Sequence, residues 1–315
     1  MQTVHTLPHA KAEVAVRLTA VLCIKGGLSA LDPALSSWWR WWRATIPGQT
    51  LVCWRDGASS AWRPLVAHGV EQELLGMWTP ASSPGAPRSI QWADRAYDHG
   101  ELLGHSVTWL DLPAVLGQER VSMICLRLPE GTSAALLTQL GEVSMQTLPL
   151  WWGTAGYALD YVSGRSDVAA QQMAALARRY WCAQLLDLTS LQWDALQGLP
   201  GVNWLTWLSA SFVEHRGLTL DDLVQALGAA SGERVFHRRS ANGLSVAAGA
   251  EPVKGDINQS EPLAPYARIA HIMKGLVLET MTPLAGPLAR PKVLKAWLNR
   301  FEAPQVWLQA DISHE

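Results

Sequence analysis

The sequence is poor in charge and shows no excess of one sign. Asp, Glu, Lys and Arg make up 17% of its 315 residues, and the formal net charge is −2. A nucleic-acid-binding protein carries a basic patch or stripe, so this balance argues against direct binding of DNA or RNA. Hydrophobic residues make up 49% of the chain, which is the composition of a folded globular protein and not of a disordered one.

Cysteine is also scarce, and its spacing forms no pair. Cys23, Cys53, Cys125 and Cys182 lie far apart, which excludes the C-x-x-C spacing of zinc and redox sites. The first residues lack a basic segment followed by an apolar core and a cleavage site, and no apolar stretch reaches the ~18 residues of a membrane span. We therefore expect four reduced thiols in a cytoplasmic protein that does not enter a membrane.

The sequence motifs of nucleotide-binding proteins and hydrolases are missing. G-x-x-x-x-G-K-[ST], G-x-G-x-x-G, G-x-S-x-G and H-E-x-x-H do not occur. His99 and His105 are six residues apart, whereas two zinc ligands on one element are usually three to five apart, so they indicate a polar loop. Two residues separate Glu251 from Lys254, where restriction-type nucleases have one, and a turn capped by Asp256 is the favoured interpretation. We predict no catalytic residue, no metal site and no cofactor.

Tryptophan is abundant: the chain has 17 Trp, against 5 Tyr and 3 Phe. A helix is expected from Pro33 to Arg43, and its period places Arg40 and Arg43 opposite one broad apolar face. That face holds Leu35, Trp38, Trp39, Trp41 and Trp42. Such a helix is either buried against a sheet or serves as an aromatic anchor for a partner. Because both arginines lie opposite the tryptophans, burial is favoured.

Apolar periodicity predicts strands and helices in mixed order. Strands are expected over 14–24, 51–54, 106–112, 121–128, 155–162, 234–239 and 244–248. Helices are expected over 33–43, 133–142, 166–180, 204–215, 264–280 and 293–301, with another beginning at Leu220 after a capping Thr219. Loops are expected over 79–88 and at a Gly153–Gly156 turn.

Because strands and helices do not alternate steadily, we predict an α+β fold in which mixed or antiparallel sheets pack with helices. The chain is expected to form one domain over residues 10–315. Two closely joined halves, 10–160 and 161–315, are the alternative division.

Several short motifs occur together and in order along the second half. They are GTAGY at 153–157, RY at 179–180, LPGVNWLTWL at 199–208, GLSVAAGAEP at 243–252, GDIN at 255–258, PY at 265–266 and WLNRF at 297–301. Together they resemble the TsiV-like family of type VI secretion immunity proteins, formerly a domain of unknown function. The resemblance covers most of the chain and is clearest from residue 150 to 302. Trp181 and Cys182 stand where a Pro-Gly pair is expected.

The resemblance implies an immunity protein that binds and inhibits a toxic effector injected by sibling cells. Some members are paired with VRR-Nuc-type nucleases, which would make the partner a DNA nuclease acting in the cytoplasm. An inhibitor of this kind needs no cofactor, nucleic acid, membrane or small-molecule substrate. Two other classes stay open, an enzyme with an unrecognised site and an adaptor of the secretion apparatus. An immunity gene, unlike either, is expected beside its effector gene.

Four acidic residues are the candidates for contact with the partner: Asp221, Asp222, Asp256 and Glu261. A nuclease groove is basic because it holds phosphates, so exposed carboxylates can cover it. Asp221 and Asp222 also suit the first turn of a helix, where the helix dipole favours negative charge. We expect apolar and aromatic contacts to carry much of the affinity and the acids to set orientation and association rate. The motif residues Asn203, Gly249 and Gly255 are expected to be structural, with Asn203 capping a helix.

Overall fold

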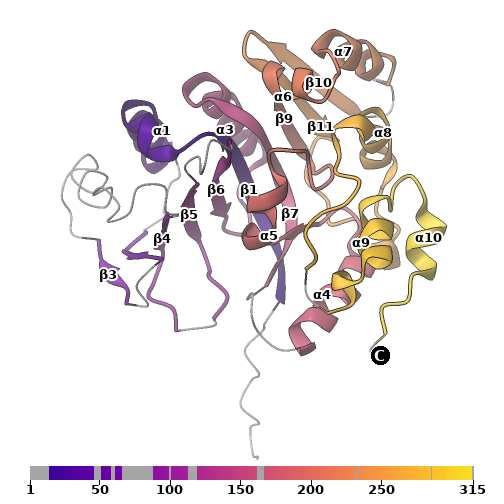
Figure 1. Ribbon diagram of the computed structural model, residues 1–315, viewed down its shortest axis with the longest axis horizontal. Coiled ribbons are helices and arrows are strands. Elements are labelled where there is room, and N and C mark those ends of the chain that lie inside the picture. Colours follow the sequence, from indigo (N-terminus) through magenta and orange to yellow (C-terminus); the bar gives the residue numbers. More distant parts are fainter. Residues whose placement is uncertain are drawn as a thin grey trace, which may run out of the picture.

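The computed structural model describes residues 14–45, 51–57, 61–65, 88–98, 101–112, 119–161, 167–230, 232, 234–284 and 286–313. Within these ranges, eleven strands form one sheet in the order β10-β11-β9-β7-β1-β6-β5-β4-β2-β3, with β8 paired to β7. Helices cover the sheet, so the predicted α+β fold is confirmed. In Figure 1 the strands run from β3 on the left, through β1 and β7 in the centre, to β9, β11 and β10 on the right.

The strands are β1 (Val14–Lys25), β2 (Cys53–Asp56), β3 (Arg63–Pro64), β4 (Arg88–Ala93), β5 (Ser106–Asp111), β6 (Val121–Arg127), β7 (Leu150–Tyr161), β8 (Gln184–Leu186), β9 (Leu205–Ser209), β10 (Val235–Ser240) and β11 (Gly243–Ala248). Their pairing is antiparallel except for β8, which runs parallel to β7. The two twelve-residue strands β1 and β7 pair along nearly their whole length and form the centre of the sheet.

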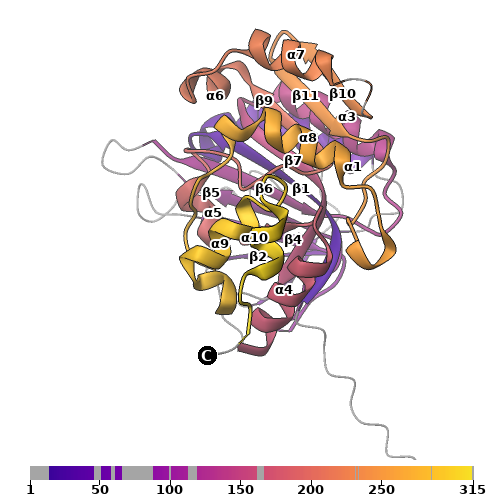
Figure 2. The ribbon, with the colours of Figure 1, turned by 90° about the vertical axis from the view of Figure 1, so that its right-hand side faces the viewer.

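The α-helices are α1 (Asp32–Thr45), α3 (Ala134–Thr147), α4 (Asp167–Arg179), α5 (Leu188–Asp194), α6 (Ala210–His215), α7 (Leu220–Ala229), α8 (Ala264–Ile272), α9 (Pro291–Leu298) and α10 (Pro304–Gln309). Their apolar faces belong to two clusters of buried side chains. The larger cluster joins the sheet to α1, α3, α6, α7 and α8, and the smaller one holds α4 and α9 against the start of β1 and the end of β7. Figure 2 shows α4, α9 and α10 grouped below α6, α7 and α8.

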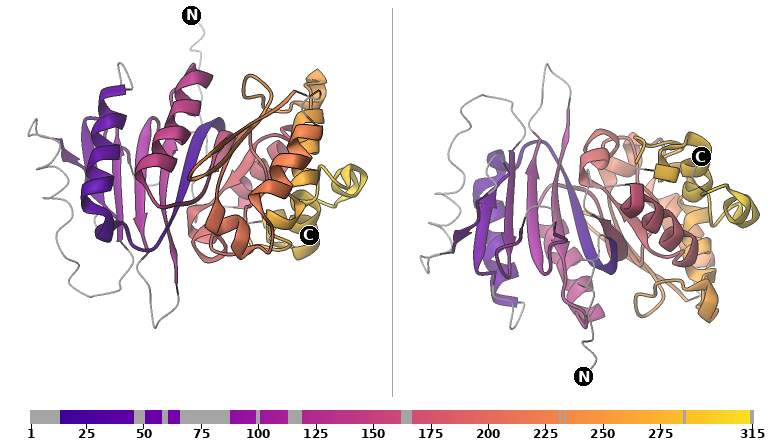
Figure 3. Two further views of the ribbon diagram at one scale, coloured as in Figure 1. Left: turned by 90° about the horizontal axis from the view of Figure 1, so that it is seen from above. Right: turned by 90° about the horizontal axis from the view of Figure 1, so that it is seen from below.

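Helix α1 is a core helix, as its periodicity predicts. Trp39 is fully buried, with its ring centroid 4.8 Å from that of Trp92 in β4 and 5.4 Å from that of Trp109 in β5. The indole N–H of Trp38 donates to Ser144 Oγ of α3 at 2.9 Å. Figure 3 shows α1 and α3 on one face of the strands (left) and the opposite face of the same strands turned to the viewer (right).

The predicted turn from Gly153 to Gly156 is wrong, because both glycines lie inside β7. A Cβ on Gly153 would lie 2.8 Å from Trp207 Cε3, and a Cβ on Gly156 would lie 2.1 Å from Asn203 Oδ1. Gly156 also has φ +148°, which side-chain-bearing residues rarely adopt. These glycines therefore mark a close approach between neighbouring segments and not a reversal of the chain.

The helix expected over 204–215 is also wrong in its first part. Residues 205–209 form the buried strand β9, and the helix begins only at Ala210. Its N-cap is Ser209, whose Oγ accepts a hydrogen bond from Phe212 N at 3.2 Å, and not Asn203. All five residues of β9 are buried, so the strand has no polar face that would show a period of two.

Other predicted elements agree with the structure or end earlier. The β10–β11 hairpin forms, and Thr219 caps α7, with its Oγ1 accepting from Asp222 N at 3.1 Å. The helix expected over 264–280 ends at Ile272 and is followed by a 3₁₀ turn at Lys274–Leu276. Residues 79–87 of the expected loop lie outside the described residues, and Arg88 begins β4.

The four cysteines are buried and free. Burial raises the pKa of the Cys125 thiol to about 11, and it also raises the pKa of Cys23. These thiols are therefore protonated near neutral pH and pack as small apolar groups. Among the described residues, we find no helix with the length and hydrophobicity that a membrane crossing requires.

Candidate functional site

The motif segments of the second half converge inside the molecule. Asn203 Nδ2 donates to the carbonyl of Tyr157 in β7 and to Gln184 Oε1 in β8, both at 3.3 Å. Gln184 Nε2 in turn donates to the carbonyl of Gly201 at 3.0 Å. Asn203 is buried and joins three segments of the fold, as expected for a structural residue, although it does so without capping a helix.

A second motif contact joins Arg179 to Asp256. The guanidinium donates from Nη2 at 2.7 Å and from Nε at 3.0 Å to Asp256 Oδ2. This hydrogen-bonded pairing with Arg179 lowers the pKa of the Asp256 carboxyl below its ordinary value. Asp256 Oδ1 accepts from Asn258 N at 3.0 Å and so caps the short 3₁₀ helix Ile257–Gln259. The capped turn is confirmed, but the expected exposure of Asp256 is wrong, because the residue is only 3% exposed.

Glu261 supports the same loop from the other side. Its Oε2 accepts from the backbone N–H of Gly255 at 2.7 Å and of Asp256 at 3.0 Å. Gly255 has φ +70°, and a Cβ there would lie 2.5 Å from Cys182 Sγ, which explains why the turn requires glycine. Asp256 and Glu261 thus hold a loop of the fold in place.

The closing motif places a guanidinium in the interior. Arg300 is buried, and it donates from Nε to the carbonyl of Trp181 at 2.7 Å and from Nη1 to that of Trp297 at 3.0 Å. Burial lowers the pKa of Arg300 to about 10. Its guanidinium carbon also lies 4.3 Å from the centroid of the Trp297 ring, a cation–π contact. The motif side chains in these contacts thus point into the molecule and stabilise the fold.

The other two predicted acids lie on the surface at the start of α7. Asp221 and Asp222 are both exposed. Asp222 Oδ2 accepts from Thr219 Oγ1 at 2.7 Å, and Asp221 pairs with Arg239 of β10. The structure therefore brings Asp221 and Asp222 together at one helix start, and Asp256 and Glu261 together in a separate loop.

The sheet face opposite α1 carries a polar site that no sequence motif indicates. Gln91 and Thr108 alternate with Trp92 and Trp109 along β4 and β5, so their side chains point away from α1. A cavity of about 290 Å³ lies here. Its lining residues are Ser89, Gln91, Thr108, Leu110, Arg127, Tyr161, Leu186, Asp187, Leu188 and Gln192.

One carboxylate in this face serves two arginines. Arg127 donates to the two oxygens of Asp160 at 2.7 and 3.1 Å, and Arg17 Nε lies 3.5 Å from Asp160 Oδ2. Burial alone would lower the pKa of Arg127, but the Asp160 carboxylate outweighs burial and the pKa is raised. Two guanidinium groups thus share one buried carboxylate.

Trp193 in α5 lies beside this site and is 61% exposed. The guanidinium carbon of Arg120 lies 4.8 Å from the centroid of its ring. Every other tryptophan that the structure describes is buried or half-buried. The exposure of Trp193 could not be predicted from the sequence, because the number of tryptophans does not indicate where each one lies.

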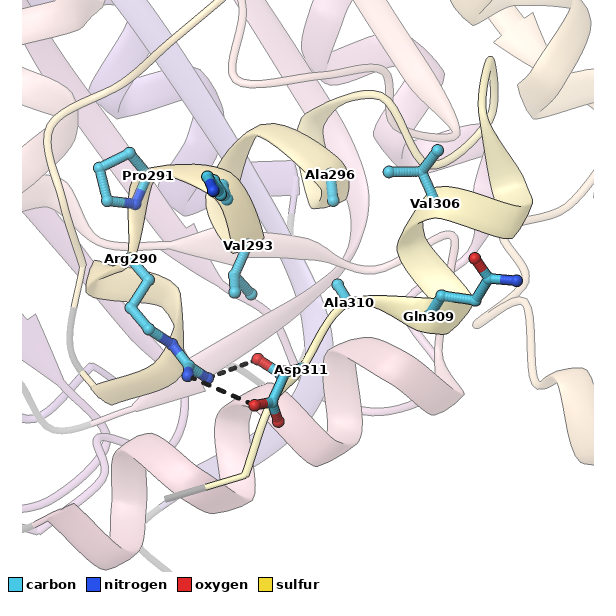
Figure 4. Close-up of a pocket in the computed structure, with 9 residues that line it drawn as sticks. Arg290, Pro291, Val293, Ala296, Val306, Gln309, Ala310 and Asp311 are labelled. Atoms are coloured by element: carbon cyan, nitrogen blue, oxygen red, sulfur yellow. Dashed lines mark hydrogen bonds and ion pairs between the residues drawn. The ribbon is translucent and has the colours of Figure 1, made fainter. Parts of the chain in front are cut away.

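A larger cavity of about 690 Å³ lies between α9 and α10. Its lining includes the apolar side chains of Val293, Ala296 and Val306, and Figure 4 shows Arg290 pointing toward Asp311 at one side. His105, considered above as a metal ligand, is buried, and its Nδ1 lies 2.8 Å from the carbonyl of Arg127, while His99 lies outside the described residues. Across the described ranges, no group of three or more His, Cys, Asp or Glu could hold a metal ion.

Residues 127–301, more than half of the chain, match the TsiV family, described as type VI immunity for VRR-NUC. The chain belongs to the TsiV family. The family suggested by the short motifs is thereby confirmed, and with it the assignment to type VI immunity. The match begins at the end of β6 and stops at the last residue of the WLNRF motif.

Comparison with solved structures finds the same fold in the Pseudomonas aeruginosa T6SS protein PA0821. The two have a TM-score of 0.70 and 19% sequence identity, and the similarity covers 96% of this chain and 88% of that one. The shared fold therefore extends well beyond the TsiV match, into the N-terminal strands. Comparison with curated proteins gives no match.

Proposed function

We propose that this TsiV-family protein binds a VRR-Nuc-type nuclease effector directly and silences it by covering its active site. The observation that carries the proposal is the family match over residues 127–301, whose description names that class of effector. The inward-facing motif contacts also support it, because they leave the exposed surface available for a partner. A stable complex of this kind buries roughly 1,200–2,000 Å² of total surface.

Two of the four candidate acids can take part in electrostatic contact with the effector. Asp221 and Asp222 are exposed and can meet the basic wall of a nuclease groove, whereas Asp256 and Glu261 hold their own loop. Because Arg239 pairs with Asp221, the local negative charge is small. The two acids therefore orient the effector and speed its association, and apolar and aromatic contacts supply most of the affinity.

Co-expression tests the function in cells. Bacteria that produce the cognate VRR-Nuc effector should stop growing and should recover when this chain is also produced. The effector recovered from the protected cells should be intact and bound to this chain. Protection accompanied by a degraded or modified effector would favour an enzyme, and failure to protect despite abundant soluble protein would contradict the proposal.

Neutralising the two exposed acids should change the rate of association more than the affinity. In Asp221→Asn/Asp222→Asn, association with the effector should be several-fold slower at low salt, and its salt dependence should be flatter, because the long-range attraction is lost. Stopped-flow or surface-based kinetics at several salt concentrations measures both effects. Asp256→Asn is the matched control, since it should lower the stability of the fold and leave the association rate of the folded fraction unchanged. Equal rates for the double variant and the parent at every salt concentration would contradict the role of these acids.

A further inference from the structure

Trp193 is an exposed aromatic side chain, whereas the other tryptophans of the described residues are buried or half-buried. Transfer of its large apolar ring from water into a partner lowers the free energy of the complex. Tryptophan is also among the residues most enriched at the centres of protein interfaces. The exposure is a property of α5, which packs against the sheet through its other residues, such as the buried Leu191.

Hydrogen bonds hold both ends of α5, the helix that contains Trp193. At its start, Asp187 accepts from Ser190 N at 3.3 Å and from Tyr161 Oη at 2.6 Å. At its end, Asp194 Oδ2 accepts from Thr282 N at 2.6 Å. A side chain on a fixed helix loses little freedom when it is bound, which favours affinity.

Arg120 places a positive charge beside Trp193. It stacks on the indole ring and forms no ion pair with a carboxylate of the described residues. The charges in the neighbouring polar cavity, which Leu188 and Gln192 of α5 border, are balanced, because its lining holds one guanidinium, Arg127, and one carboxylate, Asp187. An exposed ring that carries the single unpaired guanidinium of Arg120 is complementary to an apolar pocket with an acidic rim.

We infer that Trp193 is the anchor by which this protein holds its effector. The indole enters an apolar pocket on the effector, and Arg120 faces acidic side chains at the rim of that pocket. This inference rests on the proposed function and deepens it, because it assigns the aromatic contact and the chemistry of the partner surface. Helix α5 then lies at the centre of the interface, on the sheet face opposite α1 and α3.

Removing the ring tests the anchor against a similarly exposed apolar residue. The effector, made harmless by an active-site substitution, is titrated into the parent, Trp193→Ala and Val306→Ala by calorimetry. Val306 is 58% exposed and lies on α10, which belongs to the smaller core cluster, whereas α5 packs on the larger one. Trp193→Ala should raise the Kd by at least ~30-fold, as expected for a central anchor, and Val306→Ala should change it by less than ~3-fold. Because Trp193 is exposed, the variant should keep the circular dichroism spectrum of the parent.

A parent that binds and a Trp193→Ala variant that binds equally well would overturn the anchor and leave the proposed function standing. A parent that does not bind would overturn both. The charge of the partner surface is tested with Arg120→Ala and Arg120→Glu. Affinity should fall from the parent to Arg120→Ala and further to Arg120→Glu, and an unchanged or increased affinity of Arg120→Glu would overturn the acidic rim.

Discussion

Replacing Asp160 by alanine is expected to lower the free energy of unfolding by about 3–5 kcal/mol, the usual cost of removing one partner from a buried ion pair. Asp160 is 1% exposed and is the carboxylate that holds both Arg127 and Arg17. Without it, two guanidinium groups in the sheet lose their compensating charge. Chemical denaturation of the parent and of Asp160→Ala measures the difference.

A surface ion pair provides the control for this loss. Lys25 Nζ lies 3.0 Å from Glu119 Oε2, and the Glu119 side chain is 63% exposed. Glu119→Ala should therefore lower the free energy of unfolding by less than about 1 kcal/mol. If Asp160→Ala were no more damaging than Glu119→Ala, Asp160 would not be the compensating charge of this sheet face.

Trp39→Ala should also lower the free energy of unfolding by about 3–5 kcal/mol, because it removes a large buried ring and leaves a cavity. The Trp39 ring lies between α1 and the sheet and touches Trp92 and Trp109. The lost contacts include the layer that fixes α1 over β4 and β5. Thermal or chemical unfolding should show the loss, together with a changed near-ultraviolet signal from the neighbouring indoles.

Trp193→Ala is the matched comparison, since it removes the same side chain from an exposed position. It should change the free energy of unfolding by no more than about 0.5 kcal/mol. Similar losses for Trp39→Ala and Trp193→Ala would contradict the assignment of one ring to the core and the other to the surface.

The fate of α1 shows what the sequence alone can predict. Its tryptophans recur at the helical period with both arginines opposite, and such a pattern has one stable solution, burial against an apolar layer. The β10–β11 hairpin and the Thr219 cap were predictable for a similar reason, because each depends on residues close together in the chain.

The errors concern features that depend on distant residues. The sequence around the glycines of β7 is typical of a turn, and only the packing of Trp207 and Asn203 against them explains why glycine is needed in a strand. The buried strand β9 shows no alternation because both of its faces are covered. Asp256 looks like an exposed loop acid, but its partner Arg179 lies 77 positions earlier in the chain.

Short motifs nevertheless identified the family, and the structure explains why they could. Gly156 and Gly255 leave no room for a Cβ, and Asn203 and Arg300 make inward hydrogen bonds that few other side chains could replace. Residues under such constraints mark the fold. The exposed Trp193 lies outside all of these motifs.

If this protein inhibits a VRR-Nuc effector by binding it, a titration of nuclease activity should show stoichiometric inhibition. Purified chain is added in increasing amounts to a fixed concentration of active effector, and DNA cleavage is followed. Cleavage should fall linearly to zero at a fixed, stoichiometric ratio, and active effector should be recovered when the complex is dissociated. Full cleavage in the presence of excess chain, or inactivation by far less than a stoichiometric amount, would contradict it.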